Sequence, residues 1–492
     1  TMPSRIFAPG GSVMFTNRFL SPQVDNHTEI EYRAVLTKGG AVVDRWARKL
    51  SIWPKQVKMQ LPSDFGLFDP DAVLGKRLEA RGLGGGKILR ELTADKLAGL
   101  GSLWLSFGNN GANTGDWRRM REALHAFVKN GGSVILDRAP AAVLRDLPVE
   151  MKNGKGFAEG DRLEITYAYP RAPFHPAIKD FTDSDFSLWG ADYYVARSCV
   201  EIPQEGNAVP LLVAGTDRAG LSSSPLLELR YGRGSYIVST LEIFAKLAEA
   251  PAAARLYGSM ASYRPAWGSR STAVSFAEEG WKRLQEVGYV GENSTPAAAL
   301  SADCSVIDGA RFADGDTHAL RQALAAGRTV CLHALDKDKT AALLKSLNLP
   351  GEALPGTAAP GEWDIFKHNH PLANGMTHNY LYWIVNKAKV AAWTLAPTHP
   401  EPASALIRLP DGAAGAVSLT RRGAVTVYAV GKGTLVLDNL RWHLGDFDEP
   451  ERPRRYLRCL LTNLGVPLLK GVEKHMGEDF ETEAERRERG HF

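Results

Sequence analysis

The chain contains one unit twice, and this duplication constrains its fold more than any other feature. Three pairs of segments recur in the same order: His175–Gly190 with His370–Trp383, Asp116–Val134 with Asp316–Val330, and Gly232–Val238 with Gly431–Leu437. The first residues of the members of each pair are separated by 195 to 200 positions. A period of this length is domain-sized, so the pattern predicts a tandem domain duplication and not a solenoid of short repeats.

Length and composition limit the class of protein. A chain of 492 residues is too long for one hydrophobic core, and its length favours about three domains. Lys and Arg number 59 against 55 Asp and Glu, and the two signs are interspersed. We therefore expect no nucleic-acid partner and no anionic membrane partner. We also expect no membrane-spanning segment, since no run of 18 apolar residues occurs, and no signal peptide in the opening TMPSRIFAPGGSVMF.

The four cysteines predict buried free thiols. They are widely separated, at Cys199, Cys304, Cys331 and Cys459, and form neither a CxxC pair nor a Cys/His metal-binding spacing. No metal and no other cofactor is expected.

The N-terminal region reads as antiparallel β-structure. In Glu29–Leu36, apolar residues alternate with charged ones at the period of a half-buried strand. Lys38-Gly39-Gly40 is a turn signal, and Ala41–Leu50 fits the partner strand of a hairpin. Together with Ser12–Phe19 and Gln56–Leu61, these strands predict a small β-sandwich, complete or partial.

From Asp64 onward, strands alternate with helices. Buried strands are expected at 65–68, 102–107 and 133–136, with a helix capped by Asp116 before the last of them. The second copy repeats this order from Ser271, with strands at 272–276, 304–308 and 329–333. Such alternation predicts parallel sheets with helices on both faces, that is, two doubly wound, flavodoxin-like α/β domains. We predict domains at 1–62, 63–265 and 266–474, followed by a charged tail at 475–492.

The Gly-rich run Gly82–Lys87 does not fit a phosphate-binding loop. No Ser or Thr follows the lysine, and the run lies after a helix and before a strand. A helix-terminating loop is the better interpretation.

The β/α order and the segment Val128–Leu136 (VKNGGSVIL) resemble the class I glutamine amidotransferase-like domain. In active members of that family, the strand after the Gly turn leads into a nucleophile elbow with a Cys or Ser between glycines. Here the corresponding positions read Asp137-Arg138-Ala139 and His333-Ala334-Leu335. Because neither copy offers a nucleophile, the family's catalytic triad cannot be transferred to this chain.

Other motifs resemble a narrower group, the amidotransferase-like domains behind the catalytic barrel of large bacterial glycoside hydrolases, such as the β-galactosidase trimerisation domain. The motifs are 66–82, 175–197 and 225–243, and the N-terminal strands resemble the immunoglobulin-like sandwich of family 2-type enzymes. The resemblance covers residues 10–265 well and 266–470 as a diverged copy. It implies an extracytoplasmic location, periplasmic or secreted, although nothing in the chain itself indicates a compartment.

A retaining glycosidase needs two carboxylates about 5 Å apart, which normally lie at the ends of barrel strands. The chain shows no eightfold strand–helix repeat. We therefore interpret Glu228, Asp192 and Asp438 as solvated or structural acids and assign no catalytic residue. A catalytic barrel would lie elsewhere in the same protein or on another chain.

Two aromatic clusters are the candidate sugar-binding sites. The candidates are Trp189, Asp192, Tyr193 and Tyr194 in the first copy, and Asn379, Tyr382 and Trp383 in the second, where Tyr380 is adjacent. Aromatic rings can stack on the C–H faces of sugars while Asp or Asn bonds their hydroxyls. The alternative is that these rings pack a domain core or the seam between the copies. His175 and His370, each before a proline, are interpreted as turn residues that bond locally.

The sequence thus predicts an accessory part or companion of a carbohydrate-active hydrolase that shapes a substrate cleft, joins subunits as a homo-oligomer or binds polysaccharide. Two alternatives stay open. One is a hydrolase with its own site at the carboxyl ends of a sheet, and the other is a purely structural dimerisation scaffold.

Overall fold

The computed structural model describes residues 20–25, 28–54, 57, 59–108, 111–149, 164–203, 207–216, 220–265, 270–356, 365–381, 403–444 and 451–468. The chain divides into two compact units, residues 1–57 and 58–492. The predicted strand at Ser12–Phe19, the tail at 475–492 and the candidates Tyr382 and Trp383 lie outside the described residues.

The first unit contains an antiparallel hairpin of β1 (Thr28–Lys38) and β2 (Ala41–Ile52), as the alternation predicted. Opposite residues share a face, and the pairs Ile30–Leu50 and Ala34–Trp46 place apolar side chains on one face, which Arg48 and Asp44 share. We predicted a β-sandwich here. Within the described residues of this unit, β1 and β2 are the part of it that the structure shows. Of the predicted strand Gln56–Leu61, the described residues 57, 59 and 60 lie outside any strand, and Leu61 begins the first strand of the α/β sheet.

The first α/β sheet has nine strands in the order β4-β3-β5-β6-β11-β10-β9-β7, with β8 paired to β10. The strands are β3 (Leu61–Phe68), β4 (Gly85–Leu89), β5 (Ser102–Ser106), β6 (Ser133–Asp137), β7 (Tyr169–Pro170), β8 (Val200–Glu201), β9 (Ala208–Thr216), β10 (Gly220–Tyr231) and β11 (Gly234–Ser239). β4, β3, β5, β6 and β11 run parallel, whereas β10, β9 and β7 continue the sheet antiparallel.

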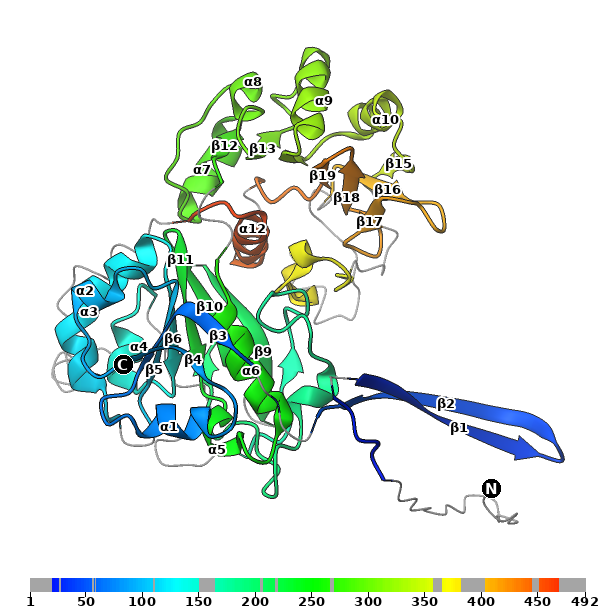
Figure 1. Ribbon diagram of the computed structural model, residues 1–492. Helices are drawn as coiled ribbons and strands as arrows, with labels where there is room; N and C mark the ends of the chain where they lie inside the picture. Colours follow the sequence, from blue (N-terminus) through cyan, green and yellow to red (C-terminus); the bar gives the residue numbers. More distant parts are fainter. Residues whose placement is uncertain are drawn as a thin grey trace, which may run out of the picture. The chain divides into compact units, whose positions relative to one another are not determined.

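Helices cover both faces of this sheet (Figure 1). They are α1 (Val73–Glu79), α2 (Ala94–Leu97), α3 (Thr114–Lys129), α4 (Ala141–Arg145), α5 (Ile243–Lys246) and α6 (Pro251–Ser262). In β5, Leu103 and Leu105 share a buried cluster with Trp117 of α3, whereas Trp104 contacts Tyr257 of α6 on the opposite face. Successive residues of one strand therefore enter two cores, which explains the unbroken apolar run at 103–105.

The second sheet has six strands in the order β12-β13-β14-β19-β18-β17. They are β12 (Thr272–Ser275), β13 (Cys304–Asp308), β14 (Thr329–His333), β17 (Ala416–Ser418), β18 (Val425–Val430) and β19 (Gly433–Asp438), and β15 (Glu352–Pro355) with β16 (Ala405–Arg408) forms a separate pair. The helices are α7 (Glu278–Glu286), α8 (Pro296–Ala299), α9 (Thr317–Ala325), α10 (Lys337–Ser346) and α12 (Glu451–Leu464). Short 3₁₀ turns lie at η1 (Asp183–Phe186), η3 (Asp314–Asp316), η4 (Pro371–Ala373) and η5 (His378–Leu381).

The two sheets have the same topology. The run β3-β5-β6-β11-β10-β9 corresponds strand for strand to β12-β13-β14-β19-β18-β17. In both sheets the third strand pairs in parallel with the last strand of the repeat, β6 with β11 and β14 with β19. Asp137 lies opposite Ser239 in the first pair, and His333 lies opposite Asp438 in the second. The predicted fold class, an α/β protein with tandem doubly wound domains after an antiparallel N-terminal segment, is confirmed.

The N-cap of helix α3 differs from the prediction. Helix α3 begins at Thr114, after Asn113, so Asp116 lies in the first turn of the helix and not at its cap. There its carboxylate still faces the positive end of the helix dipole.

Candidate functional site

Both copies have a left-handed turn, here called the elbow, at the carboxyl end of their third strand. After β6, Arg138 has a φ of 58°, and after β14, Ala334 has a φ of 53°. Their N–H groups donate to equivalent carbonyls, Arg138 to Ser239 and Ala334 to Asp438, each at 2.7 Å. A left-handed backbone costs a non-glycine residue about 1–2 kcal/mol, so the turn is imposed by its surroundings in each copy.

The side chains at these elbows cannot attack a carbonyl. Ala334 has no reactive group, and the Arg138 guanidinium lies 3.3 Å from the Glu242 carboxylate. Cys331 lies fully buried within β14, three residues before Ala334, and all four cysteines are free thiols. Burial raises the pKa of Cys304 to about 12 and that of Cys459 to about 11, which disfavours thiolates at neutral pH.

The first elbow carries an unusual acid. Asp137 is 1% exposed, and burial raises the pKa of its carboxyl to about 7. The Ser106 hydroxyl donates a hydrogen bond to this carboxyl at 2.6 Å. That bond and the charge of Arg138 lower the pKa of Asp137, whereas the Glu242 carboxylate raises it. Asp137 is thus poised to exchange a proton near neutrality.

The second elbow carries a buried hydrogen-bonded chain instead. Asp438 Oδ2 lies 3.2 Å from His333 Nδ1, and His333 Nε2 lies 2.7 Å from His443 Nδ1. Asp438 also accepts from Trp442 Nε1 and from the Tyr456 hydroxyl, each at 2.8 Å. Burial first, and then His333, lowers the pKa of His443 to about 4. Asp438 therefore joins β14, β19 and α12 as a structural acid.

The His-Pro motifs form the same local turn in both copies, as predicted. The ring Nδ1 of His175 accepts from the Ala177 N–H, and that of His370 accepts from the Leu372 N–H, each at 3.2 Å. His175 also lies 3.2 Å from Glu228, which is fully buried and accepts from Tyr263. Burial alone would raise the pKa of Glu228, but His175 and then Arg230 outweigh it and lower that pKa to about 2.

The candidates of the first aromatic cluster lie in different environments. Trp189 is 2% exposed and its indole N–H donates to the Asp185 carbonyl, so its ring is packed inside. Tyr193 is 58% exposed in a left-handed turn, and Tyr194 lies under the Arg197 guanidinium at 4.3 Å. Asp192 pairs with the buried Lys246 and with Arg197. A ligand can therefore reach the tyrosines more easily than the tryptophan.

In the second copy only Asn379 of the three candidates lies within the described residues. Asn379 lies in η5, while Tyr382 and Trp383 follow beyond the described segment 365–381. The neighbouring Tyr380 packs against the core that contains Tyr456. Sugar binding at either cluster stays a prediction.

Sequence reasoning missed an aromatic pair of which one ring, that of Tyr169, is exposed. The rings of Tyr167 and Tyr169 lie 4.4 Å apart, and Tyr169 is 50% exposed. Their spacing of two residues in an extended segment places them on one face, which is the signal that could have identified them.

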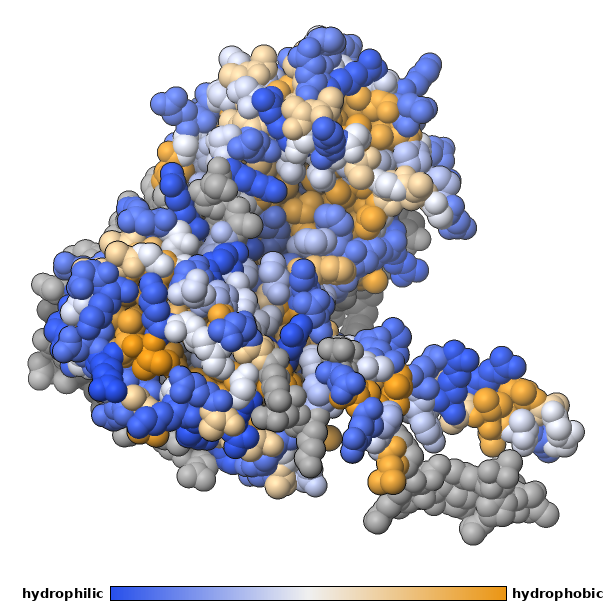
Figure 2. Space-filling model, in the orientation of Figure 1, coloured by the Kyte–Doolittle hydropathy of each residue, from blue (hydrophilic) through white to orange (hydrophobic). Residues whose placement is uncertain are grey.

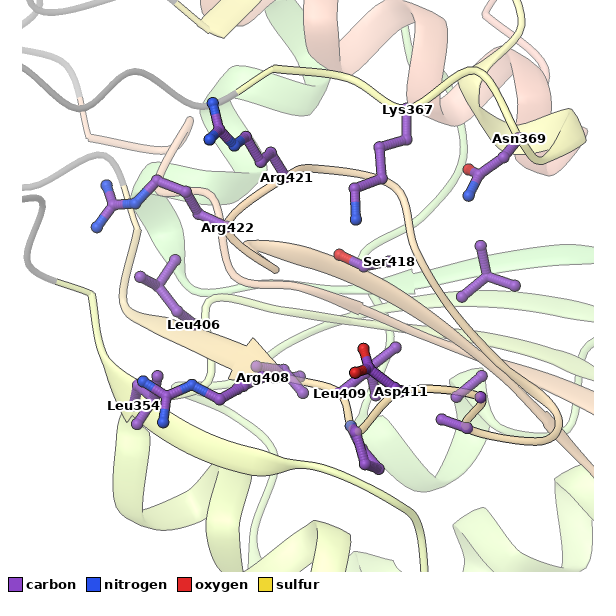
Figure 3. Close-up of a pocket in the computed structure, with 16 residues that line it drawn as sticks. Leu354, Lys367, Asn369, Leu406, Arg408, Leu409, Asp411, Ser418, Arg421 and Arg422 are labelled. Atoms are coloured by element: carbon purple, nitrogen blue, oxygen red, sulfur yellow. The ribbon is translucent and has the colours of Figure 1, made fainter. Parts of the chain in front are cut away.

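A groove of about 640 Å³ lies between the β15–β16 pair and edge strand β17 (Figure 3). Its charged and polar lining comes from Lys367, Asn369, Arg408, Asp411, Ser418, Arg421 and Arg422, and its apolar lining includes Leu354, Leu406, Leu409 and Val417. Figure 3 shows the Lys367 and Asn369 side chains entering from the loop opposite Ser418. A smaller hollow of about 350 Å³ lies beside the second elbow, where the Lys339 ammonium is bonded to the Gly309 carbonyl.

Among the described residues, no group of three or more His, Cys, Asp or Glu side chains is arranged to hold a metal ion. The same part of the chain contains no helix with the length and apolar character needed to cross a membrane.

Comparisons with known proteins give distant structural likenesses only. No family model and no curated protein sequence matches the chain. The cytoplasmic protein STM3548 of Salmonella typhimurium is 14% identical with a TM-score of 0.27, covering 48% of this chain and 97% of its own. An exo-β-1,4-mannosidase from Opitutaceae bacterium strain TAV5 (14%, TM-score 0.25) and a β-galactosidase from Rahnella sp. R3 (12%, 0.24) match over 40% and 39% of this chain. These matches span 35% and 31% of the two enzymes.

Proposed function

We propose that this chain is a non-catalytic accessory part, or companion, of a carbohydrate-active glycoside hydrolase, in which it contacts polysaccharide. The pair of elbows is the observation that supports a non-catalytic role. Both keep the strained backbone of a nucleophile turn, yet they present Arg138 and Ala334 there. A duplicated α/β scaffold without attacking groups is suited to binding and positioning.

The proposed contact with polysaccharide rests on the motifs at 66–82, 175–197 and 225–243 and on the chemistry of the surface. The exposed rings of Tyr169 and Tyr193 can stack on sugar faces, and the groove offers the Asn369 amide and the Ser418 hydroxyl to sugar hydroxyls. Joining subunits is a compatible role of the same scaffold.

The test is an activity panel combined with a binding assay. The purified 492-residue chain should leave aryl glycosides of several sugars intact and should be retarded in gels that contain polysaccharide. Turnover of any aryl glycoside above the buffer rate would contradict the non-catalytic role. Retardation equal to that of an unrelated protein of similar size would contradict the binding role.

The buried acid at the first elbow favours a second candidate, a hydrolase with its own site at the carboxyl end of β6. Asp137, with a pKa raised to about 7 by burial, has the protonation behaviour of a general acid, and Glu242 supplies a second carboxylate nearby. This candidate requires turnover by the wild-type chain that Asp137→Asn abolishes while folding is preserved. Turnover unaffected by Asp137→Asn would place the activity elsewhere.

A further inference from the structure

We propose that the groove beside β17 binds anionic sugars, those carrying carboxylate or sulfate groups. This inference deepens the proposed polysaccharide contact and rests on it. It concerns residues outside both aromatic clusters and both elbows.

Charge is the first argument. Lys367, Arg408, Arg421 and Arg422 line the groove with a single carboxylate, Asp411, so the formal charge of the lining is positive. Lys367 and Arg421 make no side-chain ion pair or hydrogen bond within the described part of the chain. Arg408 lies 3.3 Å from Glu352, but both side chains are more than 60% exposed, so this pair can exchange for a ligand. The Lys367 and Arg421 cations, which have no such partner in that part of the chain, attract anions.

The backbone holds these cations in place before any ligand arrives. The Lys367 N–H donates to Leu419 at 2.7 Å and the Arg421 N–H to Ile365 at 2.9 Å, which ties the loop of Lys367 to the turn of the arginines. Gly423 holds that turn against β16: its carbonyl accepts from Ile407, and a Cβ there would lie 2.0 Å from the Ile407 oxygen. Pre-organised cations lose less freedom on binding.

The remaining lining selects a sugar over other anions. A volume of about 640 Å³ suits an extended ligand rather than a single ion. Asn369 and Ser418 offer neutral partners to hydroxyls, and the leucines at 354, 406 and 409 offer apolar contact to C–H groups. Among the described residues, those that line the groove include no aromatic ring on which a nucleobase could stack. Guanidinium groups bind carboxylate and sulfate through paired hydrogen bonds.

The test is affinity electrophoresis of the full chain in gels with polygalacturonate, dextran sulfate or neutral dextran. We expect retardation by at least one anionic polymer, weakened by added salt, and at least a roughly tenfold loss of affinity in Lys367→Gln/Arg421→Gln. The matched control Lys282→Gln/Lys432→Gln removes the same charge from exposed positions outside the groove lining and should bind as the wild type does. The two anionic gels distinguish carboxylate from sulfate recognition.

The outcomes separate this inference from the proposed function. Equal loss in the groove and control variants would show attraction to net charge and overturn the groove assignment. Retardation in the anionic gels that the groove variant keeps in full would overturn it too, but would leave the accessory role standing. No retardation in any gel would overturn both the groove assignment and the polysaccharide contact. Displacement by inorganic phosphate as effective as by galacturonate at equal ionic strength would reduce the groove to a general anion site.

Discussion

Asp137 shows how one residue at an elbow couples stability to pH. Burial raises the pKa of its carboxyl to about 7, so the folded chain keeps this proton at pH values where the unfolded chain, with an ordinary pKa of 3.8, has lost it. The folded state therefore binds more protons between about pH 4 and pH 7, and this group's contribution to the free energy of unfolding falls as pH rises through that window. The expected slope is about 1.4 kcal/mol per pH unit.

Urea denaturation of wild type and Asp137→Asn at several pH values from about 4.5 to about 7.5 measures this slope. The difference in unfolding free energy between the two should shrink, or turn in favour of the variant, as pH rises, because Asn cannot ionise. Asp338→Asn, at an exposed position of α10, is the control and should follow the wild type. A constant difference across the range would show that Asp137 titrates as an ordinary surface acid.

At the scale of elements, the two copies use the same close contact between a strand and a helix end. A Cβ on Gly234, at the start of β11, would lie 2.0 Å from the Gly132 oxygen and 2.3 Å from the Val128 oxygen. In the second copy, a Cβ on Gly433 would lie 2.6 Å from the Leu324 oxygen. These contacts give a physical reason for the repeated Gly-x-Gly that marked the duplication in the sequence.

Gly234→Ala should therefore lower the free energy of unfolding by about 1–3 kcal/mol, the usual cost of forcing a methyl group into a packed backbone contact. Gly115→Ala is the matched control, since a methyl group on Gly115, in α3, would meet no described atom within 4 Å. It should be neutral or stabilising by up to about 1 kcal/mol. Equal thermal and urea midpoints for the two variants would contradict the packing explanation.

Regular elements were predictable because they depend on local patterns. The bounds of β13 and β14 equal those expected from their apolar runs. The elbow positions were also predictable from the resemblance, although the left-handed backbone of Ala334 has no local signal. The groove was not predictable, because Lys367, Arg408 and Arg421 come together only through loops and the small β15–β16 pair. Nor was the pKa of Asp137, which burial within the assembled sheet controls.

At the scale of the whole molecule, stability should differ sharply between the hairpin unit and the centres of the two sheets. β1 and β2 form a two-stranded sheet with Leu36 60% and Trp46 50% exposed, and hydrophobic side chains lie among the polar ones over the hairpin surface (Figure 2). β6 and β14, by contrast, pair on both sides and are buried on both faces. An isolated two-stranded hairpin is marginally stable in water, whereas a central strand opens only with the global unfolding of its domain. Hydrogen–deuterium exchange followed by mass spectrometry should thus label 28–52 within seconds and 133–137 and 329–333 over hours.

Protection of 28–52 comparable to that of β6 would show that further strands or a partner cover the hairpin. Such protection is what the complete sandwich predicted from the N-terminal pattern requires. Trp46→Ser distinguishes the two states of the hairpin, because it should leave the global unfolding free energy unchanged if the face that carries Trp46 is open and lower it by about 3 kcal/mol or more if that face is covered.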